Sequence, residues 1–415
     1  METFHEKYNP FLYMKKTIAS TLSAMLLLAG CTGSRTAQDF VSENVDNAVA
    51  QLTRQTDIIE QSGKILNPRT TNEDGSVKYV PYDDWCSGFF PGCMWYTYKL
   101  TDDDKWRDLG RKYTEDLEEV QHLKWHHDVG FMVGSSYLNG LRMAGIEEYK
   151  PVIIETARSL STRFRPAAGV IQSWDADKGW QATRGWKCPV IIDNMMNLEL
   201  LFEASKLSGD STFYNIAVSH ANTTMANHFR SNNSCYHVVD YDPETGEVRG
   251  KQTAQGYADE SSWARGQAWA LYGYTMCYRY TNDRRYLDQA KKVYDFVFDN
   301  QHMPDDLVPY WDFDAPNIPN EPRDASAAAC MASALYELSG YDKSKDYKAT
   351  ADRILASLAS ESYRAKPGTN GNFILMHSVG SIPHNAEIDV PLNYADYYFL
   401  EALDRKREIE KQANA

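Results

Sequence analysis

The sequence lacks the features that mark several large classes of protein. It has no basic excess: 43 Lys and Arg stand against 57 Asp and Glu, which excludes the clustered positive surface of a nucleic-acid-binding protein. It has only seven cysteines, none paired as C-x-x-C, so no dense disulfide framework is expected, and the six beyond Cys31 are interpreted mainly as small core residues, with one disulfide left open. After residue 31 no apolar run approaches the length of a membrane-spanning helix.

Motifs for metal, nucleophile and phosphate chemistry are also missing. His126 and His127 are adjacent rather than on one helical face, and no H-E-x-x-H or Cys/His cluster occurs, so neither a metal nor a cofactor is expected. The G-x-S-x-G pattern of serine hydrolases and the glycine-rich phosphate loop do not occur either. Carboxylates are therefore the groups expected to carry the chemistry.

The N-terminal segment, residues 1–31, is interpreted as an extension followed by a lipoprotein signal. A positive start at Met14-Lys15-Lys16 precedes the apolar run Thr17 to Gly30, which is too short to span a bilayer. The run ends in small residues before Cys31, as in a bacterial lipoprotein, and Cys31 would carry the lipid; the alternative is a buried N-terminal helix. We expect a periplasmic or cell-envelope lipoprotein of a Gram-negative bacterium, with the membrane contacted only through this anchor.

A helical repeat fills most of the remaining sequence. Five times a helix-like stretch ends in a short polar turn and is followed by a new helix with an aromatic residue near its start. The turns are Tyr98–Asp102, Met143–Gly145, Leu207–Asp210, Tyr280–Asp283 and Leu338–Tyr341. Ser, Thr, Asn and Asp can cap the next helix, and Gly permits a left-handed exit from the previous one. Each unit is therefore predicted to be a helical hairpin.

Apolar periodicity on both sides of these turns predicts twelve helices. They cover roughly residues 37–62, 85–100, 103–121, 129–144, 147–164, 191–207, 210–229, 262–280, 283–301, 324–340, 343–361 and 393–410. The excess length falls in the connections 165–190, 230–261, 302–323 and 362–392, and short strands are expected at Tyr236–Tyr241 and Glu247–Gln252. A closed ring tolerates long loops better than an open solenoid does. The prediction is an all-α fold, one (α/α)6 barrel over residues 32–415, with long loops forming the active-site cleft at one end.

Two aspartates near predicted helix starts are the first catalytic candidates. Asp193 follows the apolar run 189–192 and precedes an apolar helix, so desolvation should raise its pKa, as a catalytic acid requires. Asp128 lies in the Trp- and His-rich segment Trp125 to Phe131. A plainer interpretation of Asp128, as a helix N-cap, stays open.

A third segment, Gln255 to Trp269, combines rings, an amide and a cation. On a helix starting near Ser262, Trp263 lies one turn from Gln267, and Arg265 lies one turn from Trp269. Arginine can hold a carboxylate by two parallel hydrogen bonds. The alternative is a structural arginine paired with an acid, beside two core tryptophans.

Five segments together resemble the unsaturated glucuronyl hydrolases of glycoside hydrolase family 88. They are Trp85–Gly92, His127–Phe131, Ile192–Leu198, Gln255–Tyr257 and Trp263–Trp269. The resemblance implies a six-hairpin barrel in which Asp193 is the catalytic aspartate and Asp128 a second essential one. It further implies a subsite for the unsaturated sugar formed by His127, His237, Gln255, Trp263, Arg265 and Trp269, with Trp85 and Trp174 as further ring-stacking residues.

The chemistry that the resemblance implies is hydration of a vinyl ether in a glycosaminoglycan-type oligosaccharide that ends in a 4,5-unsaturated uronic acid. Asp193 would protonate C4 and then help a water to add at C5, while Asp128 would keep Asp193 protonated. Two positions depart from the pattern: Ala254 replaces a histidine found in some members, and His377–His384 lacks the lysine of members that accept sulfated fragments. Two alternatives remain, an unsaturated rhamnogalacturonyl hydrolase acting on pectin fragments and a non-catalytic glycan-binding helical lipoprotein.

Overall fold

The structure, a computed structural model, describes residues 37–414. The chain divides into two compact units, residues 1–42 and 43–415, and the architecture below is that of the second. The predicted signal segment and the lipidation site Cys31 lie outside the described residues. Within residues 37–414, no helix combines the length and the apolar character needed to cross a membrane.

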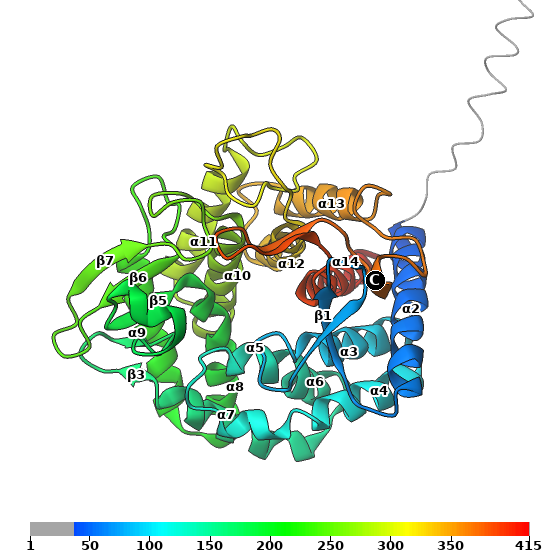
Figure 1. Cartoon of the computed structure of the whole chain (residues 1–415), viewed down its shortest axis with the longest axis horizontal. Helices are drawn as coiled ribbons and strands as arrows, with labels where there is room; N and C mark the ends of the chain where they lie inside the picture. Colours follow the sequence, from blue (N-terminus) through cyan, green and yellow to red (C-terminus); the bar gives the residue numbers. More distant parts are fainter. Residues whose placement is uncertain (1–36, 415) are drawn as a thin grey trace, which may run out of the picture. The chain divides into compact units, whose positions relative to one another are not determined.

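Helices make up most of the second unit (Figure 1). They are α2 (Ala37–Gln61), α3 (Phe89–Thr101), α4 (Asp104–Glu115), α5 (Val129–Val133), α6 (Asn139–Ala144), α7 (Lys150–Ser161), α8 (Leu198–Ser208), α9 (Ser211–Asn227), α10 (Ala264–Thr281), α11 (Arg284–Phe298), α12 (Ala325–Tyr341), α13 (Tyr347–Leu358) and α14 (Asn393–Asn414). Each of the twelve predicted segments contains α-helix, which confirms the periodicity. A π-helical segment, Gly134–Leu138, separates α5 from α6 within one of them.

The hairpin turns use the capping chemistry that the sequence predicts. The side chains of Asp103, Asp210 and Asp283 each accept a hydrogen bond from a backbone N–H in the first turn of α4, α9 and α11. Gly145 and Gly209 end α6 and α8 in the left-handed conformation, with φ of 67° and 75°. These turns fold each pair of helices back on itself, because they satisfy the free amides of one helix while ending the other.

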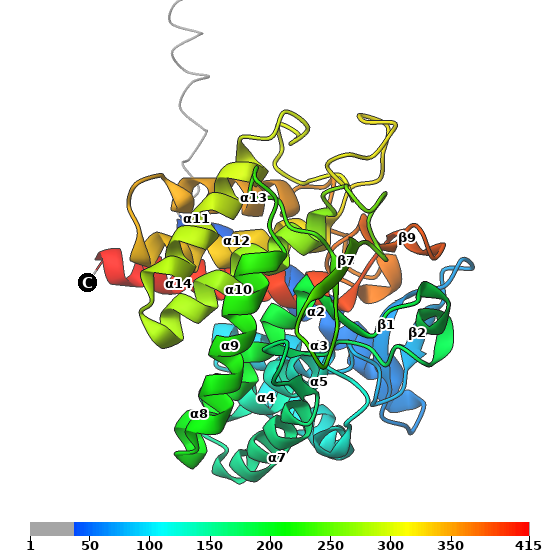
Figure 2. The same cartoon turned by 90° about the vertical axis from the view of Figure 1, so that its left-hand side faces the viewer.

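The hairpins are arranged as a ring (Figures 1 and 2). The inner wall is formed by α3, α5 with α6, α8, α10, α12 and α14, and α4, α7, α9, α11 and α13 lie outside it. The inner position explains why nearly every residue of α10 and α12 is buried. Because α14 packs against both α12 and α3, the ring is closed, as the barrel prediction requires. The six described cysteines are buried and unpaired, so the disulfide left open is not formed.

The inner helices run in the same direction, and two cavities show this. On α10, Arg265 lines one cavity and Arg279 lines the other. On α14, Tyr394 lines the first of these cavities and Glu408 lines the second. Fourteen residues of α-helix rise about 21 Å, so the second cavity extends to the far end of the inner wall. The helix starts face the first cavity.

Short strands lie in the connections, and four of them contribute residues to the wall of the first cavity. The strands are β1 (Asn67–Thr71), β2 (Val77–Val80), β3 (Phe164–Arg165), β4 (Val170–Ile171), β5 (Cys188–Ile191), β6 (Val238–Tyr241), β7 (Val248–Gln252), β8 (Ser378–Ser381) and β9 (Ala386–Val390). The two predicted strands are present as β6 and β7, which pair antiparallel. Strand β5, which joins their sheet, and the hairpins β1–β2, β3–β4 and β8–β9 were not predicted from the sequence.

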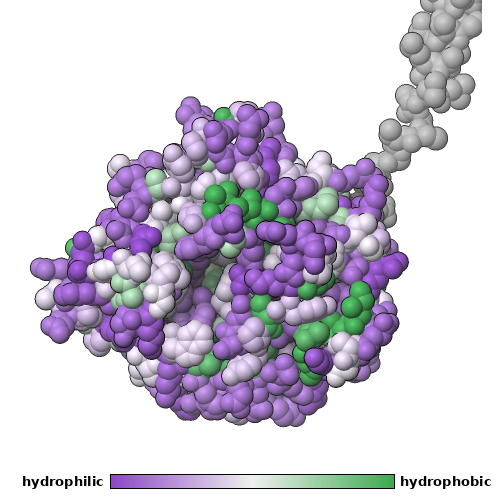
Figure 3. Space-filling view, in the orientation of Figure 1, coloured by the Kyte–Doolittle hydropathy of each residue, from purple (hydrophilic) through white to green (hydrophobic). Residues whose placement is uncertain are grey.

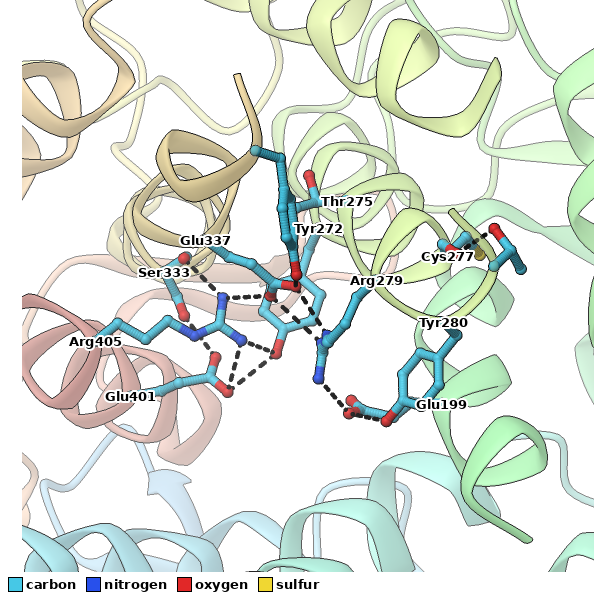
Figure 4. Close-up of polar contacts among 12 residues, drawn as sticks. Glu199, Tyr272, Thr275, Cys277, Arg279, Tyr280, Ser333, Glu337, Glu401 and Arg405 are labelled. Atoms are coloured by element: carbon cyan, nitrogen blue, oxygen red, sulfur yellow. Dashed lines mark hydrogen bonds and ion pairs between the residues drawn. The ribbon is translucent and has the colours of Figure 1, made fainter. Parts of the chain in front are cut away.

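The far end of the inner wall holds charged side chains that pair with one another (Figure 4). Arg279 of α10 forms ion pairs with Glu199 of α8 at 2.9 Å and with Glu337 of α12 at 2.8 Å. Arg405 of α14 also pairs with Glu337, at 2.9 Å. These contacts fix four inner helices to one another at the end away from the first cavity.

Candidate active site

A pocket of about 300 Å³ opens at the end of the ring where the inner helices start. The face seen in Figure 3 is hollowed near its middle. Six of the ten predicted active-site residues line the pocket: Asp128, Asp193, Gln255, Arg265, Trp85 and Trp174. The other four, His127, His237, Trp263 and Trp269, are buried without lining it. The first three contact the lining residues Asp128, Asp193 and Arg265, and Trp269 packs on Phe131, three residues after Asp128. The structure thus brings the residues singled out from the sequence to one place.

Asp193 follows directly on the buried strand β5. The sequence predicts a helix from residue 191, but the chain continues from β5 into a 3₁₀ turn, Ile192–Asn197, and α8 begins only at Leu198. The strand is held at its end because the Ile192 amide donates to the His237 carbonyl at 3.0 Å. This exit from a sheet places the Asp193 carboxyl in the pocket rather than on a helix surface.

The Asp193 carboxyl is largely shielded from water. Its side chain is 13% exposed, and Oδ2 has no hydrogen-bond partner among the described residues. Burial raises its pKa to about 7, against the opposing effects of the Arg265 charge and the Trp269 indole. A carboxyl with this pKa holds its proton through much of the range below neutral pH, as general-acid catalysis needs.

His237 faces Asp193 as a neutral imidazole. Its Nδ1 accepts hydrogen bonds from the backbone amides of Ala254 at 3.0 Å and Gln255 at 3.2 Å. Burial lowers the pKa of His237 well below its ordinary value, so the ring is neutral and its proton must be on Nε2. That nitrogen lies 3.7 Å from Asp193 Oδ2, and neither atom has a hydrogen-bond partner among the described residues.

Asp128 occupies the N-cap position of α5 but does not cap it with its side chain. Its Oδ1 accepts from Asn197 Nδ2 at 3.4 Å, and its Oδ2 lies 3.3 Å from His127 Nε2. The plainer N-cap interpretation therefore does not account for this side chain. Burial raises the pKa of Asp128 well above its ordinary value, and the charge of Asp193 raises it further. Two desolvated carboxyls that repel each other's charge together retain a proton near neutral pH.

Arg265 is held by protein groups on one side of its guanidinium. Nη1 pairs with Asp324 at 3.0 Å and donates to the Val379 carbonyl, and Nη2 donates to the Gly380 carbonyl at 2.7 Å. Arg265 therefore makes the ion pair with an acid that its structural interpretation requires. Its side chain also lines the pocket. Gln267 is committed elsewhere, because Cys235 N–H donates to its Oε1 at 2.8 Å and its Nε2 donates to the Cys235 carbonyl at 3.2 Å.

Aromatic rings surround the carboxyls on two sides. Trp85 packs at a ring distance of 4.9 Å on Tyr394, and Trp174 packs at 5.1 Å on Trp180; all four line the pocket. Trp263 lies behind them, with its ring 4.6 Å from that of His237. The pocket therefore offers flat apolar faces beside polar groups, the combination that sugar rings require.

Several pocket residues were not identified from the sequence: Arg69, Trp180, Tyr394, Ser381, His384 and Glu387. Arg69 of β1 pairs with Asp84 at 2.9 Å and with Glu387 of β9 at 2.5 Å, joining two hairpins that are far apart in the chain. Apolar and acidic residues alternate in Ala386–Val390, and this pattern could have predicted the strand β9. Within residues 37–414, no group of three His, Cys, Asp or Glu side chains is arranged to hold a metal ion.

Comparison with known proteins found matches over most of the chain. Residues 58–369 match the model of Glycosyl Hydrolase Family 88. An unsaturated glucuronyl hydrolase from Formosa agariphila is 49% identical over 334 residues, covering 80% of this chain and 82% of that protein. An unsaturated chondroitin disaccharide hydrolase from Streptococcus agalactiae is 32% identical over 373 residues, covering 88% and 91%. The crystal structure of an unsaturated glucuronyl hydrolase specific for heparin aligns with a TM-score of 0.86 at 46% identity, covering 90% of this chain and 98% of that one.

Proposed function

Because the chain belongs to glycoside hydrolase family 88, we propose that it releases the 4,5-unsaturated uronic acid from the non-reducing end of glycosaminoglycan-type oligosaccharides. It is an unsaturated glucuronyl hydrolase. The observation that carries the proposal is a buried carboxyl, Asp193, whose pKa is raised to about 7 at the floor of a tryptophan-lined pocket.

The reaction is a hydration followed by ring opening. Asp193 gives its proton to C4 of the C4=C5 double bond, and the ring oxygen shares the resulting positive charge at C5. A water then adds to C5 while the Asp193 carboxylate takes one of its protons. The bond between C5 and the ring oxygen breaks, C5 becomes a ketone, and the hemiacetal left at C1 expels the rest of the glycan as an alcohol. One water is consumed, and Asp193 ends as it began, protonated.

The proton of the acid pair belongs on Asp193 because the two sites differ in their donors. Asp128 faces the Asn197 amide and the Nε2 proton of neutral His127, and both stabilise a carboxylate. Asp193 Oδ2 has no hydrogen-bond partner among the described residues and lies 3.7 Å from His237 Nε2. With the shared proton on Asp193, the charge on Asp128 stabilises the cation formed at C5.

A panel of unsaturated disaccharides tests this function. Hydration removes the conjugated double bond, so turnover appears as a loss of ultraviolet absorbance together with release of the second sugar. Hydrolysis of glucuronyl disaccharides, with little action on the unsaturated galacturonyl–rhamnose disaccharide, is the expected result. The reverse preference would establish the rhamnogalacturonyl alternative, and binding without turnover of any disaccharide would establish the non-catalytic binding protein.

Attachment to the cell envelope is a separate part of the proposal. It rests on the sequence Leu28-Ala29-Gly30-Cys31, by which residues 1–31 would be an extension with a lipoprotein signal and residues 32–415 the catalytic domain. Expression in a Gram-negative host with a radiolabelled fatty acid should label the wild-type chain and leave Cys31→Ser unlabelled. Equal labelling of both chains, or of neither, would overturn a lipid at Cys31.

A further inference from the structure

The arginines around the pocket are not equivalent in their pairing. Arg69 is paired with Asp84 and Glu387, Arg163 with Asp175, and Arg265 with Asp324. Each of these guanidinium charges is therefore neutralised within the protein. Arg184 has no ion pair with any acid in the part of the chain that the structure describes.

Arg184 lies between two segments that line the pocket. It is the last residue of the 3₁₀ turn Gly179–Arg184, which also carries the lining residues Trp180 and Gln181. Its Nη2 donates to the Thr253 carbonyl at 2.7 Å, directly before Ala254 and Gln255. This bond holds the half-buried guanidinium beside the mouth while using one of its five N–H groups.

The ring of Trp186 holds the Arg184 guanidinium in its orientation. The guanidinium carbon of Arg184 lies 4.8 Å from the centre of the Trp186 ring, and Trp186 in turn packs on Trp174 and Trp180. The charge of Arg184 also lowers the pKa of His384, where desolvation is the larger cause, and the His384 ring packs at 5.0 Å on Trp180 of the same turn. The other residues of that segment that line the pocket, Ser381, Ala386 and Glu387, carry no positive charge.

We propose that Arg184 determines specificity by binding a sulfate on the leaving sugar. This inference rests on the proposed function, which places the uronic acid at Asp193 and sends the second sugar toward the mouth. A guanidinium without an acid partner can bind a sulfate through two parallel hydrogen bonds, and a planar ring beneath it keeps its orientation. Arg69 cannot take this role, because two carboxylates already surround it.

The test compares two unsaturated disaccharides that differ only in one sulfate on the second sugar. Arg184→Ala should lower kcat/KM for the sulfated disaccharide on the order of tenfold and change that for its unsulfated counterpart by less than about threefold. Arg184→Lys, which keeps the charge but loses the paired geometry, should fall between the two. Comparing disaccharides that carry the sulfate on the 6-oxygen with ones that carry it on the nitrogen shows which sulfate position Arg184 recognises.

A matched control is available on the same loop. Lys187 is an exposed cation held by Asp242 at 2.8 Å, so Lys187→Ala changes the net charge equally and should leave the ratio of the two kcat/KM values unchanged. If Arg184→Ala lowers kcat/KM equally for both disaccharides, the proposal is overturned. The role of Arg184 would then be to hold the Thr253 segment in place through its hydrogen bond.

Binding to inactive protein separates this inference from the proposed function. Calorimetry should show that Asp193→Asn binds the sulfated disaccharide more tightly than the unsulfated one, and that adding Arg184→Ala removes this difference. If the wild type hydrolyses neither disaccharide but the binding difference is present, the proposed function fails and the role of Arg184 stands. If hydrolysis occurs and no difference in binding exists, the role of Arg184 fails alone.

Discussion

Two groups of buried carboxyls lie at opposite ends of the same inner wall, and they differ in their partners. At the far end, Glu401 accepts from Tyr96 Oη at 2.7 Å, Tyr272 Oη at 3.0 Å and Ser333 Oγ at 2.6 Å. At the pocket end, Asp193 Oδ2 has no hydrogen-bond partner among the described residues. Glu401 is saturated with donors, and Asp193 is not.

The difference shows that burial alone does not set the state of a carboxyl. Burial would raise the pKa of Glu199, but the charges of Arg142 and Arg279 outweigh it and hold that pKa well below the ordinary value. Burial also acts on Asp193, and there it prevails, because none of the described arginines forms an ion pair with its carboxyl, and Arg265 pairs with Asp324 instead. The far end thus uses buried acids for cohesion, and the pocket end keeps one in its protonated form.

The largest effect is expected from removing the proton-transfer group. Asp193→Asn should lower kcat at least about 10³-fold, roughly 4 kcal/mol, because both the proton donor and the base that activates water are lost. Affinity for an unsaturated disaccharide should stay within about tenfold, or 1.4 kcal/mol. Steady-state kinetics and calorimetry measure the two quantities. Residual kcat within tenfold of the wild type would remove Asp193 from the chemistry.

A saturated acid should behave in the opposite way. Glu401→Ala should lower the free energy of unfolding by about 3–5 kcal/mol, because it leaves three buried hydroxyls without their acceptor and removes one of the two carboxylates beside Arg405. Turnover per folded molecule should change little. The control is Glu408→Ala two turns later on α14, whose side chain is 41% exposed and should cost less than about 1 kcal/mol. Denaturant titration measures both, and equal losses would contradict the comparison.

The pH dependence of stability should distinguish the pocket acid from its amide variant. Asp193 has a pKa of about 7 when folded against 3.8 in a model compound, so its stabilising contribution is complete below pH 4 and is lost as the pH rises to 7. The stability of the wild type relative to Asp193→Asn should therefore fall over this range, by at most about 1.4 kcal/mol per pH unit, and level off above it. Thermal or denaturant unfolding across the range measures this. A flat difference would mean that the carboxyl is already ionised at low pH.

The smallest effect should come from releasing the charge of Arg265. In Asp324→Asn the guanidinium loses its neutralising partner and acts more strongly on Asp193, whose pKa should fall. Activity should then decline at a pH lower by roughly half to one unit. Asp346→Asn, which alters the capping aspartate of α13 in the same way, should leave the pH profile unchanged. A profile that moves upward in Asp324→Asn would contradict this electrostatic account.

Local periodicity and turn chemistry were sufficient to predict the helices. Four of the five turns carry a capping aspartate or a left-handed residue, whereas Leu338–Tyr341 continues α12 and the aspartate that caps α13, Asp346, lies beyond it. Where the structure departs from the predicted helices, the cause is strand pairing, which periodicity does not show. Cys188–Ile191 is apolar throughout, as buried strands and buried helices both are, so its pairing with β6 could not be predicted from periodicity.

The candidate site was predicted where motifs lie near one another in sequence, and less well where the chain returns from a distance. Asp128, Asp193 and Gln255 were named and line one pocket, although their catalytic or binding roles stay predictions. The partner of Arg265 is Asp324, 59 residues later, and Glu387 meets Arg69 across 318 residues. The sequence around these residues does not specify either of the two ion pairs.

The common direction of the inner helices has an electrostatic consequence. They begin near the pocket, where Asp128 precedes α5, Arg265 lies in the first turn of α10 and Tyr394 in that of α14, so their partly positive amino ends point toward one small volume. Each end favours a nearby anion by about 0.3–1 kcal/mol. A chain with a net charge of −14 can in this way present an attractive entrance to a negatively charged sugar, because the backbone itself supplies the compensating field.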